Sequence, residues 1–212
     1  LKNRWIEINE ANIAMGEAPN SVENIEGSPY NPENFITGKI YINGQKSQEH
    51  VFLRYNMLND EIEIKDSAYD TSETKAVIKD PEIYAQVGNT TYIFAPYRGS
   101  NEKGGYFAFM KAGNYYDLYK KSTVEFIPFK TTTAYSGSQA AKFKKTDKYY
   151  MVNKQGNFFR LPTSKNKLLR VMDEHKEKLA EYIELNKIKL ETEGDIIAVF
   201  NYYNLLLANE NN

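Results

Sequence analysis

The chain has 212 residues, 27 basic and 28 acidic side chains, a formal net charge of -1 at pH 7 and no cysteine. The near-neutral charge excludes a global field that would gather nucleic acid or anionic lipid, and the missing thiols exclude disulfides, thiolate metal sites and cysteine nucleophiles. Hydrophobic residues make up 41% of the chain, and the 17 tyrosines among them offer apolar area whose hydroxyls need partners, so we expect a folded core.

Residues 1–34 form the first segment, and we expect it to be irregular. Pro19, Pro29 and Pro32 oppose a long helix or a central strand, although Trp5, Ile6 and Ile8 could form one short strand or pack as an anchor. No apolar segment follows the first four residues, so the sequence as given predicts no signal peptide. We also expect no transmembrane segment, because no run of 18 or more apolar residues occurs.

Residues 35–161 have the pattern of an antiparallel β-rich body. Apolar and polar residues alternate in short stretches at intervals of roughly ten residues, separated by turn residues such as Asn43-Gly44 and Gly113-Asn114. This rhythm predicts a bent meander sheet or a partial barrel. The expected strands are residues 38–42, 51–55, 61–65, 75–78, 83–87, 90–95, 106–111, 115–120, 123–129, 147–152 and 157–161.

Residues 162–212 have a helical period and are expected to pack on the sheet, giving one structural domain overall. Thr163 or Ser164 can cap a first short helix, and Asp173 can cap a second. Strands first and helices last predict an α+β fold.

A third helix is expected to open at a variant capping box, Thr192 with Asp195 three residues later. We expect its apolar stripe to pack on the sheet or on the second helix, with an exposed docking surface for a partner as the alternative. The stripe consists of Ile196, Val199, Phe200, Tyr203, Leu206 and Leu207.

Several short stretches, in order from Gly27 onward, carry a resemblance: Gly27-Ser28-Pro29-Tyr30, Leu53-Arg54-Tyr55-Asn56, Asn59-Asp60-Glu61-Ile62-Glu63-Ile64, Ala140-Ala141-Lys142-Phe143, Tyr149-Tyr150, and Asp195-Ile196-Ile197 running to Tyr202-Tyr203-Asn204. Together they resemble an uncharacterised family of secreted or periplasmic proteins from Bacteroidetes bacteria. The resemblance implies export and a β-rich body with a helical tail. That family has no established activity, so no catalytic residue is carried over from it.

Few patterns in the chain are typical of catalysis. His50 and His175 supply the imidazoles, neither stands in a zinc-binding motif, and we interpret both as solvent-facing or edge residues. Neither the nucleophile elbow Gly-x-Ser-x-Gly nor a phosphate-binding loop occurs. We therefore predict no metal site and no cofactor.

Carboxylates are the remaining catalytic candidates. Glu61 and Glu63 share one face of an expected strand and lie roughly 7 Å apart by strand geometry. With Asp60 nearby, they could act as the paired carboxylates of a glycoside hydrolase. Since Ile62 and Ile64 take the opposite face, the simplest interpretation makes the two glutamates the solvated side of the sheet.

Aromatic residues on the expected strands are the candidate ligand contacts. On the concave side of a curved sheet they could line a groove for lipid, peptide or glycan, whereas packed beneath the helices they would be core, which we favour. A groove for single-stranded nucleic acid would also be basic, and basic residues are spread evenly among acidic ones. The six candidates are Tyr92, Phe94, Phe107, Phe109, Tyr115 and Tyr119.

The sequence therefore favours a non-catalytic exported or cell-envelope protein that binds a partner protein or a small apolar or glycan ligand, and no nucleic acid. The alternative is a hydrolase that uses paired carboxylates. Whether the protein is an enzyme stays open at this point, with the balance against it.

Overall fold

The computed structural model describes residues 5–7, 25–67, 74–96, 104–128 and 140–210. The chain forms two compact units. Unit 1 contains Leu1–Tyr106 and Ser122–Thr146, and unit 2 contains Phe107–Lys121 and Asp147–Asn212.

Strands dominate the first three quarters of the chain and helices end it. The elements are β1 (Trp5–Glu7), β2 (Tyr30–Ile42), β3 (Gln45–Asn56), β4 (Glu61–Lys65), β5 (Lys75–Val77), β6 (Ile83–Val87), β7 (Thr90–Ala95), β8 (Gly105–Lys111), β9 (Tyr116–Ile127), β10 (Lys142–Asn153), β11 (Phe158–Leu161), α1 (Lys165–Val171), α2 (Lys176–Leu185) and α3 (Glu193–Glu210).

The described strands form one open antiparallel sheet in the order β1-β5-β4-β3-β2-β6-β7-β8-β9-β10-β11. Most neighbours in this order are also neighbours along the chain, as in a meander. The sheet followed by three helices confirms the predicted α+β class. Strands β8, β9 and β10 each contribute residues to both units.

The β2–β3 hairpin has the predicted turn but begins earlier than expected. Asn43 and Gly44 both have positive φ, at 52° and 73°, as a tight hairpin turn requires. Strand β2, however, starts at Tyr30 and includes Pro32, inside the segment expected to be irregular. The register shifts between Asn31 and Ile36, and this irregularity accommodates the proline, which lacks a donor for the ladder.

His50 occupies a second irregularity of the same hairpin. Gly38 pairs with Val51 but Lys39 pairs with Glu49, so His50 is the extra residue of a β-bulge. Its φ is 57° and its side chain is 87% exposed. The solvent-facing position predicted for this histidine is therefore correct.

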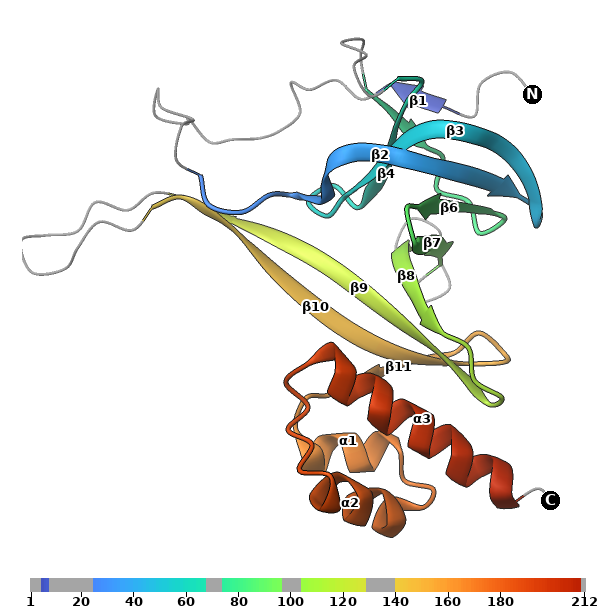
Figure 1. Ribbon diagram of the computed structural model, residues 1–212, viewed down its shortest axis with the longest axis vertical. Coiled ribbons are helices and arrows are strands. Elements are labelled where there is room, and N and C mark those ends of the chain that lie inside the picture. The colour runs from blue at the N-terminus through green and yellow to red at the C-terminus, as the bar shows by residue number, and fades with distance from the viewer. Residues whose placement is uncertain (1–4, 8–24, 68–73, 97–103, 129–139, 211–212) are drawn as a thin grey trace, which may run out of the picture. The chain divides into compact units, whose positions relative to one another are not determined.

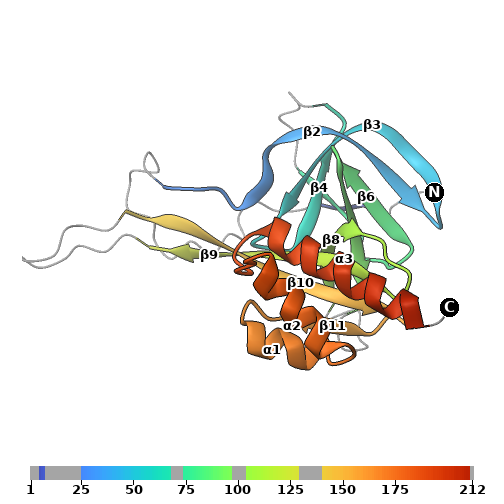
Figure 2. The same ribbon diagram turned by 60° about the horizontal axis from the view of Figure 1, so that its bottom comes forward.

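The core of unit 1 lies against β2, β3, β4 and β6, which Figure 2 shows side by side. Gly38 is required here, because a Cβ at this position would meet the Gln86 carbonyl and the Leu53 side chain. The fully buried side chains of this core include Ile40, Leu53, Tyr55, Ile62 and Tyr106.

Strand β9 differs from the prediction. Lys121-Ser122 was expected to separate two strands, but β9 runs without a break from Tyr116 to Ile127. Ser122 is buried, and its carbonyl oxygen lies 3.2 Å from the Tyr55 hydroxyl. Tertiary pairing therefore overrides the local turn preference of this dipeptide.

The three helices belong to unit 2 and lie together beside β10 and β11, as Figure 1 shows. The predicted apolar stripe of α3 is buried, so its packed interpretation is correct and its docking alternative is wrong. The stripe joins a cluster with side chains from the other two helices and the sheet, among them Leu118, Met151, Leu161, Leu168 and Leu179.

Of the three predicted helix caps, one forms its expected side-chain hydrogen bonds, and Ser164 is the N-cap of α1 without such a bond. Asp195 N–H donates to Thr192 Oγ1 at 3.1 Å, and Thr192 N–H donates to Asp195 Oδ2 at 3.3 Å, which confirms the capping box. The expected cap at Asp173 is wrong, because His175 with φ of 59° is the N-cap of α2. Asp173 instead accepts the Glu174 N–H.

The first turn of α3 is anchored to the sheet of unit 2 by one carboxylate. Glu193 Oε2 lies 2.7 Å from Lys120 Nζ on β9 and accepts a hydrogen bond from the Tyr149 hydroxyl on β10 at 3.2 Å. A carboxylate in the first helical turn is also favoured by the helix dipole.

Candidate functional site

Glu63 is one of the three carboxylates that the sequence offered for catalysis, and it is not on a solvated face. Its exposed fraction is 3%. Arg54, directly opposite on β3, donates from Nε to Glu63 Oε2 at 2.6 Å, and Asn56 Nδ2 donates to Oε1 at 2.8 Å. The solvated-side prediction is wrong for this residue, and both of its oxygens are engaged inside unit 1.

The guanidinium that holds Glu63 is itself enclosed by aromatic rings. Arg54 Cζ lies 3.4 Å from the centroid of Tyr30 and 4.2 Å from that of Phe35. Cation–π contact on a partly desolvated guanidinium adds to the ion pair. These contacts fix β2 to β3 and β4, which is a structural role.

Asp60 follows the same pattern. The Tyr55 hydroxyl donates to Asp60 Oδ1 at 2.6 Å, and the Tyr106 N–H lies 3.2 Å from the same oxygen. Burial raises the pKa of both Tyr55 and Tyr106, and the Asp60 carboxylate raises it further. Asp60 therefore serves as an acceptor for buried donors.

Glu61 is the one candidate with a feature expected of a general acid. Burial raises the pKa of its carboxyl, and the Glu63 and Asp60 carboxylates add to this effect while Lys79 opposes it. A raised pKa in a cleft is a mark of catalytic acids. Its nearest partner carboxylate, Glu63, is held by Arg54 and Asn56.

The predicted ligand contacts do not form one groove. Tyr92 and Phe94 are buried in the core of unit 1. Tyr92 packs on Tyr55 with centroids 4.8 Å apart and accepts a hydrogen bond from Asn31, and Phe94 packs on Tyr106 at 5.6 Å. Both are core residues, as favoured, but they belong to unit 1 and not to the cluster that the helices form in unit 2.

Three other candidates meet on the face of the unit 2 sheet that is opposite the helices. Phe109 pairs with Tyr119 across β8 and β9, with centroids 5.4 Å apart. Phe107 and Tyr119 both contact Phe158 on β11. Phe107 is buried, whereas Phe109 is 36% exposed, so this aromatic cluster is open at one end.

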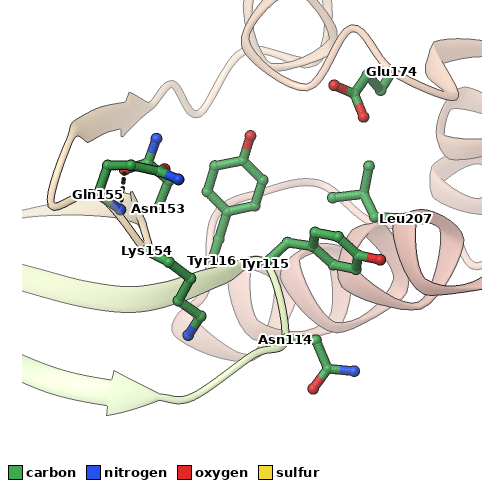
Figure 3. A pocket seen from close by; sticks show the side chains of 8 residues that line it. All are labelled: Asn114, Tyr115, Tyr116, Asn153, Lys154, Gln155, Glu174 and Leu207. Carbon is green, nitrogen blue, oxygen red and sulfur yellow. Dashed lines mark hydrogen bonds between the residues drawn. The ribbon is translucent and has the colours of Figure 1, made fainter. Parts of the chain in front are cut away.

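Tyr115, the sixth candidate, lines a pocket of about 240 Å³ in unit 2 (Figure 3). Two hairpin turns, the segment before α2 and the buried side of α3 supply the lining. Its residues are Asn114, Tyr115, Tyr116, Asn153, Lys154, Gln155, Glu174 and Leu207.

The β8–β9 turn is held against α3 by one buried amide. Asn204 Oδ1 accepts the N–H groups of Tyr115 and Tyr116 at 3.3 and 3.2 Å, while its Nδ2 donates to Phe200 O at 3.2 Å. A Cβ at Gly113 would collide with Asn204. The asparagine that interrupts the apolar stripe therefore positions the two pocket tyrosines.

The β10–β11 turn is braced as well. Asn153 Oδ1 accepts the N–H groups of Gln155 and Asn157 at 3.1 and 2.9 Å. Lys154 Nζ lies 2.8 Å from Asp117 Oδ1, which also accepts the Gly113 N–H. Asp117 thus links the two turns and compensates the charge of Lys154.

Tyr116 lies near the centre of the pocket lining in Figure 3. In the view of Figure 3 its hydroxyl points toward the side of Glu174, with the Asn153–Gln155 turn on one side of its ring and Leu207 on the other. Burial raises the pKa of the Tyr116 hydroxyl, and the carboxylates of Glu174 and Asp173 raise it further. The hydroxyl is therefore protonated at neutral pH and can donate.

Of the residues that line this pocket, Tyr115 alone was among the predicted ligand contacts. The signal available for Tyr116 was its place in Gly113-Asn114-Tyr115-Tyr116, where two rings follow a turn dipeptide. Glu174 and Leu207 carried no comparable signal, because each is far along the chain from both turns.

Two further observations concern other kinds of site. Within the described residues, no three His, Asp or Glu side chains come together as a group that could hold a metal ion. Among the helices of these same ranges, none has the length and apolarity needed to cross a membrane.

Comparison with known proteins finds no match for this chain among protein-family models, curated proteins or solved structures.

Proposed function

We propose that this chain is a non-catalytic ligand-binding protein, exported or held at the cell envelope, that takes a small ligand in the pocket of unit 2. The observation that supports this most is how the polar groups are used. Glu63 and Asp60 are engaged by hydrogen bonds within unit 1. By contrast, the side chains of Gln155 and Glu174 line the pocket and make no hydrogen bond or ion pair within the described part of the chain.

The lining favours a polar ligand over an apolar one. Amide, carboxylate, ammonium and phenol groups surround the pocket, and Leu207 with the two tyrosine rings supplies its apolar surface. Pockets of this kind use a few placed polar groups to orient a ligand. A partner protein that presents a polar side chain or glycan here would use the same contacts. Export rests on the resemblance to secreted or periplasmic proteins.

The hydrolase remains the second candidate because of the raised pKa of Glu61. A hydrolase acting at Glu61 would need a second carboxylate free to reach the substrate. Glu63 meets this need only if its bonds to Arg54 and Asn56 break.

One pair of measurements tests the proposal. The purified chain is screened by thermal shift against polar metabolites and oligosaccharides, and its activity is assayed on chromogenic glycosides and esters. We expect a ligand that raises the melting temperature and no turnover. Turnover that disappears in Glu61→Gln, with folding intact, would reverse the order of the two candidates.

The compartment is tested separately. The protein encoded by the complete gene is located by antibody in fractionated cells, and we expect it outside the cytoplasm. Recovery in the cytoplasmic fraction alone would remove the export part of the proposal.

A further inference from the structure

We infer that the pocket of unit 2 is a binding site for one neutral sugar residue, either free or as part of a glycan. This inference rests on the proposed function and names the ligand class for its site. It follows from the volume, the lining chemistry, the charge and the bracing of the pocket.

The volume suits one ring. The pocket holds about 240 Å³, which is below the roughly 300–1,000 Å³ of sites that enclose drug-sized ligands. A lipid chain or a folded peptide would extend beyond it, whereas a single six-membered sugar ring is compact enough to enter.

The lining offers both kinds of contact that a sugar needs. A sugar ring has an apolar C–H face and a rim of hydroxyls that donate and accept. The Tyr116 and Tyr115 rings provide flat apolar surface. Gln155 provides an amide that can donate and accept, Asn153 provides the Nδ2 donor because its Oδ1 already accepts two N–H groups, and the Glu174 carboxylate accepts from hydroxyls.

The charge distribution disfavours anionic ligands. Lys154 Nζ is already 2.8 Å from the Asp117 carboxylate. Glu174, the other charged residue of the lining, would repel a phosphate or a carboxylate. The groups left for recognition are therefore mostly neutral.

The site is also largely preformed. Asn204 fixes the backbone of Tyr115 and Tyr116, and Asn153 fixes its own turn through two backbone N–H groups. Because the backbone of both turns is already ordered, ligand binding loses less conformational entropy than it would if the turns had to be ordered as well.

The purified chain is titrated with glucose, galactose, mannose and N-acetylglucosamine. Binding is measured by isothermal titration calorimetry and by changes in amide chemical shifts. Glucose 6-phosphate and glucuronate are the anionic comparison. We expect at least one neutral sugar to bind, and the anionic sugars to bind more weakly than it does.

Variants locate the binding. Tyr116→Ala should weaken binding about tenfold, because the stacking surface is removed. Gln155→Ala removes a side-chain amide that can bind the sugar, so it should weaken binding about fivefold. Because Gln155 is exposed, the change should not affect folding. The matched controls Tyr41→Ala and Gln45→Ala, both in unit 1, should leave affinity unchanged.

The outcomes separate the two proposals. If no neutral sugar binds but an anionic or apolar compound binds with sensitivity to Gln155→Ala, the sugar inference is overturned and the proposed function stands. Sugar binding that is unchanged in both Gln155→Ala and Tyr116→Ala also overturns the inference. Hydrolysis of a sugar substrate would overturn the proposed function itself.

Discussion

The two units differ in how many of their polar side chains are satisfied within the protein. In unit 1, Arg54, Glu63 and Asn56 form a closed network between adjacent strands, and Asp60 accepts bonds from two buried tyrosines. In unit 2, the interior is an apolar cluster of helix and sheet residues with the Asn204 amide among them, and further polar groups line a pocket.

This difference shows which carboxylates are available to a ligand: those whose oxygens are not already hydrogen-bonded within the protein. A carboxylate whose oxygens all face fixed donors contributes to stability and has no capacity left for a ligand. An amide or carboxylate that lines a pocket and has no partner of its own can still form hydrogen bonds with a ligand. Changes at Glu63, at the buried tyrosines, at Asn204 and at Glu61 test this difference between the units.

Glu63→Gln tests the closed network. The change removes the charge opposite the Arg54 guanidinium, which is mostly enclosed. Breaking one side of a buried ion pair costs about 3–5 kcal/mol of unfolding free energy, and urea unfolding monitored by circular dichroism measures it. Glu61→Gln, two residues along the same strand, is the matched control. A loss below about 1 kcal/mol would mean that the network is not closed.

Alkaline pH tests the buried tyrosines. The pKa values of Tyr55 and Tyr106 are raised above the usual 10.0, so above pH 10 the unfolded chain releases protons that the folded chain keeps. Stability must therefore fall as pH rises, by about 1.4 kcal/mol per pH unit for each such tyrosine. Melting temperatures between pH 8 and 11.5 measure the slope. Tyr55→Phe should make it shallower, and an unchanged slope would contradict the assignment.

Asn204→Ala tests the bracing of the pocket. The substitution leaves the N–H groups of Tyr115 and Tyr116 without their acceptor, at a cost of about 1–3 kcal/mol. It should also weaken ligand binding, although Asn204 is not in the pocket lining. Asn201→Ala, on the exposed side of the same helix, is the control. Equal effects of the two changes would argue against a positioning role.

Glu61→Gln is expected to have the smallest effect. Because burial raises the pKa of Glu61, the charged form is disfavoured in the folded state, and stability falls slightly as pH rises through the ordinary value near 4.5. The neutral amide removes this penalty, so stability at pH 7 should change by less than about 0.5 kcal/mol, upward if at all. Thermal unfolding at pH 4 and pH 7 measures it. A clear loss at pH 7 would show that ionised Glu61 makes a favourable contact.

The features predicted correctly from sequence are those fixed by neighbouring residues. The turn at Asn43-Gly44, the bounds of strand β4 from Glu61 to Lys65 and the capping box of α3 each depend on fewer than about six residues. The α3 stripe followed from helical spacing, because an apolar face of that width must be covered.

The features that escaped prediction depend on pairing across the sheet. Glu63 looks solvated in its own strand, and only its register opposite Arg54 shows why it is buried. Ser122 looks like a turn residue until Tyr55 reaches its carbonyl oxygen. The pocket could not be assembled from sequence either, since its lining is drawn from segments up to about ninety residues apart.

Because β8, β9 and β10 pass through both units, they limit where insertions and deletions can occur in this protein. Removing one residue from the middle of β9 would reverse the side-chain alternation of everything beyond that point. The strand could then keep the correct side-chain directions either at the core tyrosine contacts on one side of the deletion or at the pocket turn on the other, but not at both. Length changes should therefore be tolerated in the connections that flank these strands and rejected within them, and neither unit can be cut free by severing the chain at one place.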